Sequence, residues 1–315
     1  MATIATLTLN PALDLSTATD RVEHTHKLRC GPPRYDPGGG GINVARVVKI
    51  LGSEPVAVYP AGGPIGEMLR NSLDAIGLAQ HVISIAGVTR ESFTVDETST
   101  GKQYRFILPG PSLSAQERRE CLSAVAVLRP SPAYLVVSGG VPPGVEAADL
   151  LADVAKLARQ LGARLILDTS QAMRHAAAGA FLMKPNLREL SHIVGRPLES
   201  RADQIASARS LVREGRAEVV VVSLGAGGAL LVTDTLAEHF AAPEVPIRSA
   251  VGAGDSMVGA IVFALERGWK LRDAVRYGVA AGTATLMTPG TELCHRENVE
   301  QLFKQMNSAA AEGRA

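Results

Sequence analysis

The stretch "EVVVVSLG", Glu218–Gly225, places four valines in succession, without the alternation of apolar and polar residues that marks a sheet with one solvated face. Such a run predicts a strand buried on both faces, as in a parallel sheet covered by helices. The segment before it, "IASARSLVREG" at 205–215, has the apolar spacing of a surface helix. A helix that leads into a doubly buried strand is typical of a βαβ unit.

The same rhythm extends along most of the chain. Short apolar runs at 3–10, 133–140 and 164–170 alternate with helical patterns such as "LLADVAKLARQLG". After residue 250 the apolar spacing is helical. We therefore predict one α/β domain over residues 1–315, with a mostly parallel central sheet between two layers of helices.

Two polar segments, at about 14–36 and 88–108, interrupt this rhythm. In the second, the alternating runs "SFTVDE" and "KQYRFI" flank the turn "TSTG", which predicts a β-hairpin. A small sheet needs a covered face to be stable. We expect these lid strands to cap the functional site or to pair with their copies in a dimer.

Composition excludes several classes of partner. Lysine and arginine total 32 against 31 acidic residues, and a formal net charge of +1 offers no overall attraction to nucleic acid or to an anionic membrane. The three cysteines form no CxxC pair and indicate neither a disulfide framework nor a zinc site. No apolar run approaches the ~20 residues that span a bilayer, and the first residues lack a basic leader. We expect a cytoplasmic protein.

The segment "VGAGDSMVGA" at 251–260 joins small residues to an apolar helix. The start of a helix leaves unpaired N–H groups and a positive dipole end, so Ala253, Gly254 and Asp255 could form an anion site. Asp255 has two interpretations. It is either an ordinary N-cap, or a base that takes a proton from a hydroxyl while the N–H groups neutralise a transferring phosphoryl group.

A second glycine-rich segment, "PGGGGINVARVVKILG" at 37–52, lets a ligand approach the backbone closely. It fails as a dinucleotide fingerprint, because Asn43 stands at the third glycine position and no convincing strand precedes it. The alternative is a packing turn with Asn43 as a helix cap.

Two further segments end in polar residues after short apolar strands. In "MKPNLREL", Lys184 and Asn186 flank a proline and Glu189 follows, which suits a hydrated magnesium ion. A surface loop is the alternative. Ser223 and Gly225 lie at the carboxyl end of a buried strand, where open α/β sheets bind ligands. Since the next segment is again strand-like, a simple hairpin is the alternative there.

Charged residues near the lid strands are lesser candidates. Asp14 follows the first strand, and Lys27, Arg90 and Arg105 belong to the lid segments. Arginines at such positions can bind a phosphate with both arms of the guanidinium. Solvated surface charge is the alternative for each.

With these motifs in this order, the chain resembles the ribokinase-like sugar kinases over nearly its full length. "TLTLNPALD", "SGGVPPG" and "VVSLGAGG" are similar to the phosphosugar branch of 6-phosphofructokinases, 1-phosphofructokinases and tagatose-6-phosphate kinases. Gly40 stands where the last two usually have lysine, as in the minor bacterial 6-phosphofructokinases. The resemblance implies a three-layer αβα sandwich with a small β-sheet lid, and a homodimer formed through the lid strands.

It also implies ATP-dependent phosphorylation of fructose 6-phosphate at the C1 hydroxyl, with Asp255 as the base. Backbone N–H groups for the transferring phosphoryl group would come from Gly252, Ala253 and Gly254. Residues that would hold the phosphosugar are Asp14, Gly39, Asn43, Arg90, Arg105 and Ser138. Residues that would face ATP are Lys184, Asn186, Ser223, Gly225 and, from a neighbouring subunit, Lys27. Glu189 would face Mg²⁺, and a monovalent cation such as K⁺ would lie near Ser249, Val251, Thr285 and Gly290.

Other functions remain open on the sequence. Tagatose 6-phosphate or fructose 1-phosphate could replace fructose 6-phosphate as the acceptor, and Glu292 departs from the arginine expected near the monovalent cation. A catalytically silent sugar-phosphate binding protein would share the fold, although Asp255 and Glu189 disfavour it. A nicotinamide-dependent oxidoreductase is disfavoured by the missing third glycine.

Overall fold

The computed structural model describes residues 3–176 and 179–312. Within this part, the main sheet has nine strands in the order β13-β12-β11-β10-β9-β8-β1-β4-β5. Their bounds are β1 Ile4–Leu7, β4 Val56–Ala61, β5 Ala79–Ser84, β8 Tyr134–Ser138, β9 Arg164–Asp168, β10 Ala180–Met183, β11 Ala217–Ser223, β12 Ala229–Val232 and β13 Ala237–Phe240. In this order the strands from β11 to β5 are parallel, and β12 is antiparallel to both of its neighbours, β11 and β13. The predicted α/β class is confirmed.

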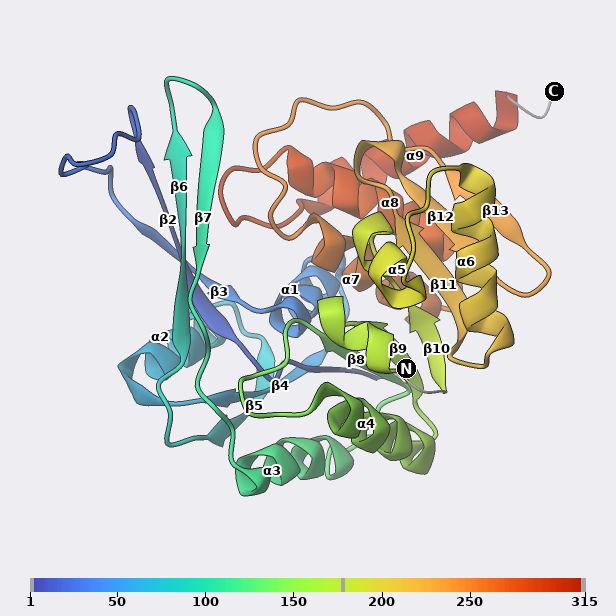
Figure 1. Ribbon diagram of the computed structural model, residues 1–315, viewed down its shortest axis with the longest axis horizontal. Coiled ribbons are helices and arrows are strands. Elements are labelled where there is room, and N and C mark those ends of the chain that lie inside the picture. Colours follow the sequence, from blue (N-terminus) through green and yellow to red (C-terminus); the bar gives the residue numbers. More distant parts are fainter. Residues whose placement is uncertain (1–2, 177–178, 313–315) are drawn as a thin grey trace.

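Helices cover both faces of this sheet (Figure 1). Their bounds are α1 Gly40–Leu51, α2 Gly63–Ala75, α3 Ala115–Ala126, α4 Ala147–Leu161, α5 Leu187–Val194, α6 Arg201–Arg213, α7 Ala253–Glu266, α8 Leu271–Leu286 and α9 Arg296–Glu312. Short 3₁₀ turns are η1 Ser170–His175 and η2 Gly225–Gly227. One core joins the sheet to α1, α7, α8 and α9, and a second core joins it to α3, α4, α5 and α6. The structure is therefore a three-layer sandwich.

The four consecutive valines of β11 pack into both hydrophobic cores. Val219 and Val221 pack into the core of α1, α7 and α8, whereas Val220 and Val222 pack into the opposite core. Successive side chains of a strand point to opposite faces, so a strand between two helix layers is apolar at every position.

The lid strands form a separate sheet in the order β3-β2-β6-β7. Their bounds are β2 Ala12–Thr19, β3 Arg34–Gly38, β6 Arg90–Glu97 and β7 Lys102–Ile107. The predicted hairpin is present as the antiparallel pair β6–β7. In Figure 1 this lid sheet stands away from the main sheet, at the left of the view. It is the sheet that carries Asp14, Arg90 and Arg105.

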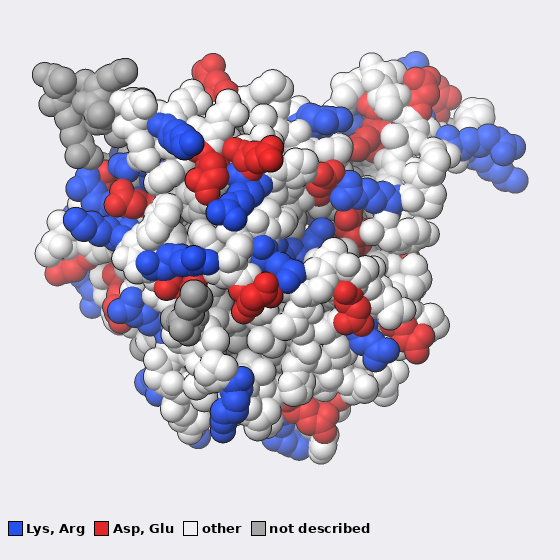
Figure 2. All heavy atoms as spheres, turned by 180° about the vertical axis from the view of Figure 1, so that it is seen from behind, with Lys and Arg blue, Asp and Glu red and all other residues white. Residues whose placement is uncertain are grey.

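Surface charge is mixed. Over the face seen in Figure 2, basic and acidic side chains are interspersed, in keeping with the formal net charge of +1. Among the described residues, no helix combines the length and apolar character that a membrane span needs.

Candidate active site

Helix α7 begins in the glycine-rich segment and carries Asp255 in its first turn. Its N-cap is Gly252, whose φ of 77° lies in the left-handed region that glycine tolerates. The interpretation of Asp255 as an N-cap is therefore wrong, because its carboxylate caps no N–H group of α7. Instead, Asp255 Oδ2 accepts a hydrogen bond of 2.8 Å from Asn43 Nδ2.

The pKa of Asp255 lies well above the usual range of a carboxyl. Burial is the main cause, and the neighbouring charge of Asp168 adds to it, whereas Asn43 and Lys184 lower the pKa. The carboxylate lies deep in the protein, yet solvent reaches it through the cavity that it lines. A carboxyl whose pKa is raised toward neutrality is suited to accept a proton from a substrate hydroxyl.

The glycine turn before α1 brings a second backbone segment to the site. A side chain at Gly40 would come within 2.3 Å of Ser138 Oγ, and one at Gly41 within 2.4 Å of Thr8 Oγ1. The turn can pack this closely only because these residues lack a Cβ. Ser138 is thereby held against the turn, at the end of β8.

The tight packing of the alternative interpretation is thus present, but two other points about this turn are wrong. Strand β3 leads directly into it, although no convincing strand was expected there. Asn43 is not a cap: α1 already begins at Gly40, with Gly39 as the N-cap residue, and Asn43 lies inside the first turn of the helix. The tight glycine packing starts the helix three residues before Asn43, which frees the amide to face Asp255.

A cavity of about 150 Å³ lies between the lid sheet and the start of α7. Predicted residues that line it are Asp14, Gly39, Asn43, Arg90, Arg105, Val251, Gly252 and Asp255. Polar lining residues that the sequence did not reveal are Ser92, Thr94 and Thr291. Segments from both ends of the chain and from the lid thus meet in one small polar cavity.

Arg90 is held at the cavity by backbone groups. Its guanidinium donates to Asn10 O at 3.2 Å and to Leu108 O at 3.3 Å, while Nε is buried and has no hydrogen-bond partner among the described residues. Burial raises the pKa of nearby Asp14 to about 6, and Arg90 and Arg105 lower it. Two arginines that line one small cavity are suited to bind an anion there.

Lys184 lies behind the start of α7 as a buried cation. Its Nζ is 3.1 Å from Asp168 Oδ1, and only 4% of the residue is exposed. The surface-loop interpretation is therefore wrong for Lys184. Sequence reasoning missed Asp168, although a carboxylate at the carboxyl end of the buried strand β9 lies at the edge where open α/β sheets bind ligands.

Asn186 and Glu189 form a reciprocal capping box at the start of α5. Glu189 N donates to Asn186 Oδ1 and Asn186 N donates to the Glu189 carboxylate, each at 2.8 Å. The hairpin that was the alternative at Ser223 and Gly225 is present as the antiparallel pair β11–β12, with Gly225 in η2. Ser223 N donates to Pro185 O at 2.9 Å, which places Ser223 beside the Lys184 segment.

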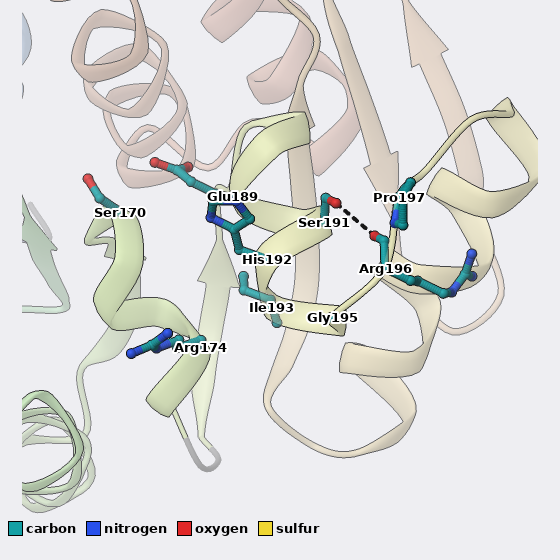
Figure 3. A pocket seen from close by; sticks show the side chains of 9 residues that line it. All are labelled: Ser170, Arg174, Glu189, Ser191, His192, Ile193, Gly195, Arg196 and Pro197. Atoms are coloured by element: carbon teal, nitrogen blue, oxygen red, sulfur yellow. Dashed lines mark hydrogen bonds between the residues drawn. The ribbon is translucent and has the colours of Figure 1, made fainter.

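A second cavity, of about 560 Å³, is larger than the one at Asp255. It lies between η1 and α5, with Arg174 on one side and His192 on the other, and Glu189 and Ser170 at one end (Figure 3). Because Glu189 lines it, this cavity is on the side of the site where the resemblance places ATP.

Three of the four residues expected near a monovalent cation are joined by hydrogen bonds, and Ser249 N also donates to the carbonyl oxygen of Leu286, the neighbour of Thr285, at 3.4 Å. Ser249 Oγ donates to Gly290 O at 2.6 Å and accepts from Val251 N at 3.2 Å. The carbonyl oxygen of Thr285 accepts from Thr288 Oγ1 at 2.7 Å. Glu292 is engaged with Arg34 at 2.7 Å and with His295 at 2.6 Å. Among the described residues, no group of three or more His, Cys, Asp or Glu forms a metal cluster.

Lys27 is an exposed residue that lies apart from the other predicted lid residues of the site. It lies in the segment between β2 and β3 and does not line either cavity.

A buried carboxylate beside the glycine-rich start of a helix is the arrangement of a phosphotransferase, in which N–H groups face a phosphoryl group and a base faces a hydroxyl. The model of the pfkB family carbohydrate kinases matches residues 8–298, so this chain belongs to that family and is a carbohydrate kinase. 

Curated relatives cover nearly the whole chain. ATP-dependent 6-phosphofructokinase isozyme 2 of Mycobacterium tuberculosis is 51% identical over 96% of this chain and 89% of the relative. The protein of the same name from Escherichia coli is 40% identical over 98% of this chain and 100% of the relative.

Solved structures agree with this assignment. Phosphofructokinase-2 from Escherichia coli in complex with fructose-6-phosphate is 38% identical, covers 98% of this chain and 100% of its own, and superimposes with a TM-score of 0.91. Ribokinase from Thermotoga maritima, at 20% identity and a TM-score of 0.77, shows the shared ribokinase-like fold alone.

Proposed function

We propose that this carbohydrate kinase transfers the γ-phosphoryl group of ATP to the C1 hydroxyl of fructose 6-phosphate. The observation that carries the proposal is one cavity lined by the Asp255 carboxylate and by two arginines, Arg90 and Arg105. A base and an anion-binding pair in one small cavity suit an acceptor that has a hydroxyl and a phosphate. The similarity to proteins named ATP-dependent 6-phosphofructokinase supports the same acceptor.

In this proposal, Asp255 accepts the proton of the C1 hydroxyl as the phosphoryl group arrives. Backbone N–H groups at Gly252, Ala253 and Gly254 face the negative charge of that group. The sugar is held by Asp14, Gly39, Asn43 and Ser138, and its phosphate by Arg90 and Arg105. Positioning and electrostatics then supply most of the rate, because phosphoryl transfer asks little covalent chemistry of the protein.

The nucleotide lies on the other side of α7 in this proposal. Its phosphates face Lys184 and Asn186, and its remaining part lies near Ser223 and Gly225. When bound, Mg²⁺ would neutralise charge on the ATP phosphates, and Glu189 is the carboxylate placed to hold its hydration shell. K⁺ would be coordinated by backbone and hydroxyl oxygens around Ser249, Val251, Thr285 and Gly290. Glu292 does not bind K⁺ in this proposal, because its carboxylate is paired with Arg34 and His295.

We also propose a cytoplasmic homodimer of the single 1–315 domain, formed through the lid strands, with Lys27 reaching a neighbouring subunit. Exposed apolar side chains on the lid segments support this: Leu28 (39%), Tyr35 (45%) and Phe106 (55%). The tetrameric inhibited form known for Escherichia coli phosphofructokinase-2 is the alternative assembly. Light scattering of the purified protein distinguishes two copies of the 33.0 kDa chain from four.

The proposed function is tested by ADP formation with ATP, Mg²⁺ and K⁺ and each of four acceptors: fructose 6-phosphate, tagatose 6-phosphate, fructose 1-phosphate and fructose. We expect kcat/KM for fructose 6-phosphate to lead by about tenfold or more, since one mispaired polar group costs about 1 to 3 kcal/mol. A lead by tagatose 6-phosphate would keep the chemistry and change the substrate. No turnover with any acceptor would favour a silent binding protein.

Replacement of Arg90 or Arg105 by alanine is expected to raise KM for the sugar phosphate by about 10- to 100-fold, because each charged hydrogen bond contributes about 1.5 to 3 kcal/mol. The KM for ATP should change by less than about threefold, because both arginines lie in the lid sheet. Lys102→Ala is the matched control, since Lys102 is an exposed cation on the same strand as Arg105. Equal effects on both KM values would contradict the role in phosphate binding.

A further inference from the structure

Arg46 is a buried cation that no part of the proposed mechanism uses. It lies on α1, one helical turn after Asn43, and only 12% of its side chain is exposed. Its Nη1 donates to Pro37 O at 2.7 Å and to Asn43 Oδ1 at 3.3 Å. Its Nη2 is 3.7 Å from Asp36 Oδ1, so the guanidinium joins the end of β3 to the amide of Asn43.

The Asn43 amide lies between a cation and a carboxylate. Its oxygen faces Arg46, and its nitrogen donates to Asp255 Oδ2 at 2.8 Å. A rotation of the amide by 180° would place N–H groups against the guanidinium and an oxygen against the carboxylate, and both contacts would then be repulsive. The two neighbours therefore select one orientation of the amide.

We propose that Arg46 is a positioning residue of the active site: it holds the amide oxygen of Asn43 and thereby aims the amide N–H at the Asp255 carboxylate. This inference rests on the proposed role of Asp255 as the base. Arg46 touches no reacting atom in this proposal. It acts through Asn43, and its own position is fixed by Pro37 and Asp36 on the lid strand β3.

Arginine suits this task better than lysine would. The planar guanidinium presents several N–H groups in a rigid fork, so that one side chain can bind Pro37 O and Asn43 Oδ1 while it faces Asp36. Burial lowers the pKa of Arg46, and the carboxylates Asp36, Asp14 and Asp255 oppose that effect. The side chain remains a cation, because arginine is not deprotonated in proteins.

The test replaces Arg46 by methionine, which keeps the length of the side chain and removes its donors, and by lysine, which keeps the charge. We expect the methionine variant to lose about 10- to 100-fold in kcat, the usual cost of a slightly misplaced reacting group. Lysine should recover part of this loss. Arg34→Met is the matched control, because Arg34 binds the same carboxylate, Asp36, at 2.9 Å and lies on β3, outside the Asn43 contact.

A pH profile separates positioning from a general loss of structure. The groups that face Asp255 are Asp168 from β9, Lys184 after β10, Asp14 from β2 and Asn43 from α1. In Arg46→Met the Asn43 amide should lose its hydrogen bond to Asp255, and this bond favours the ionised carboxylate. The pKa of Asp255 should therefore rise, and the acidic limb of the kcat/KM profile should move to higher pH by about one unit. Arg34→Met should leave the limb in place.

Two measurements keep this inference distinguishable from the proposed function. Carboxyl ¹³C NMR of the free protein follows Asp255 without substrate, with Asp255→Asn identifying its resonance, so the shift can be measured even if no sugar phosphate is turned over. In an Asn43→Ala background, Arg46→Lys should change kcat by less than about twofold, because residues that act through one another are not additive.

A folded Arg46→Met protein with wild-type kcat and wild-type Asp255 titration would overturn the inference. So would an equal shift in Arg34→Met, since the effect would then pass through Asp36. If Arg46→Met does not fold, Arg46→Lys decides: a several-fold loss of kcat with an upward shift of the acidic limb supports positioning, and unchanged values exclude it.

Discussion

Replacement of Asp255 by asparagine is expected to lower kcat by about 10²- to 10⁴-fold, the usual contribution of a general base. Asparagine has nearly the same shape and can still accept the Asn43 hydrogen bond, which is 2.8 Å long in the structure. It cannot accept a proton from the sugar hydroxyl. Turnover should therefore fall while the cavity keeps its form, and ADP formation at saturating ATP and fructose 6-phosphate measures this loss.

As a control, the thermal stability of the Asp255→Asn variant is compared with that of the wild type. Burial and the charge of Asp168 raise the folded-state pKa of Asp255 above its unfolded value, so the ionised side chain opposes folding at pH values above the folded pKa. The neutral amide removes this cost. We expect Tm at pH 8 to equal or exceed that of the wild type, and the difference to close as the pH falls from the folded pKa toward the unfolded value. Wild-type kcat in a folded variant would rule out the base.

Replacement of Lys184 by methionine is expected to lower the free energy of unfolding by about 3 to 5 kcal/mol, because it leaves a buried carboxylate without its cation. The side chains of Lys184 and Asp168 are 5% and 11% exposed, and their charged atoms are 3.1 Å apart. Burial lowers the pKa of Lys184, but Asp168 and Glu189 raise it by more, which keeps the ammonium charged. Urea unfolding measures the loss, and kcat/KM for ATP should fall with it.

The double variant Lys184→Met, Asp168→Asn is the control for this pair. It removes both charges, so it should regain most of the lost stability without regaining turnover. A single Lys184→Met variant that loses less than about 1 kcal/mol would show that the ion pair is weaker than its burial indicates.

Much of the fold was predictable because the features that decide it are local and periodic. Four consecutive valines can be buried at every position only between two layers, and the structure places Val219 and Val220 in opposite cores. The hairpin at "TSTG" was likewise visible from alternation on both sides of a turn. Both patterns depend only on residues that are neighbours along the chain, so composition and spacing were enough to predict these two elements.

The site was predictable where a residue type is unusual for its position. Asp255 follows small residues at the start of an apolar helix, and Arg90 and Arg105 lie on lid strands that line the cavity. Asp168 and Arg46 were missed for a physical reason: an isolated carboxylate or a helical arginine is ordinarily solvated, and only distant partners make these two buried. Asn43 and Asp255 were both predicted, but the hydrogen bond between them was not, because the two residues are 212 positions apart in the sequence.

The parallel pairing of β2 with β6 has a consequence for how the molecule assembles. Ala12 pairs with Arg90 and Thr19 with Glu97, so every backbone bond of this ladder joins segments separated by β3, α1, β4, α2 and β5. Contacts of such high sequence separation form slowly, because the intervening chain must first be ordered. The lid is therefore expected to be among the last parts to fold, and the phosphate-binding arginines to come into register only once the first half of the main sheet exists.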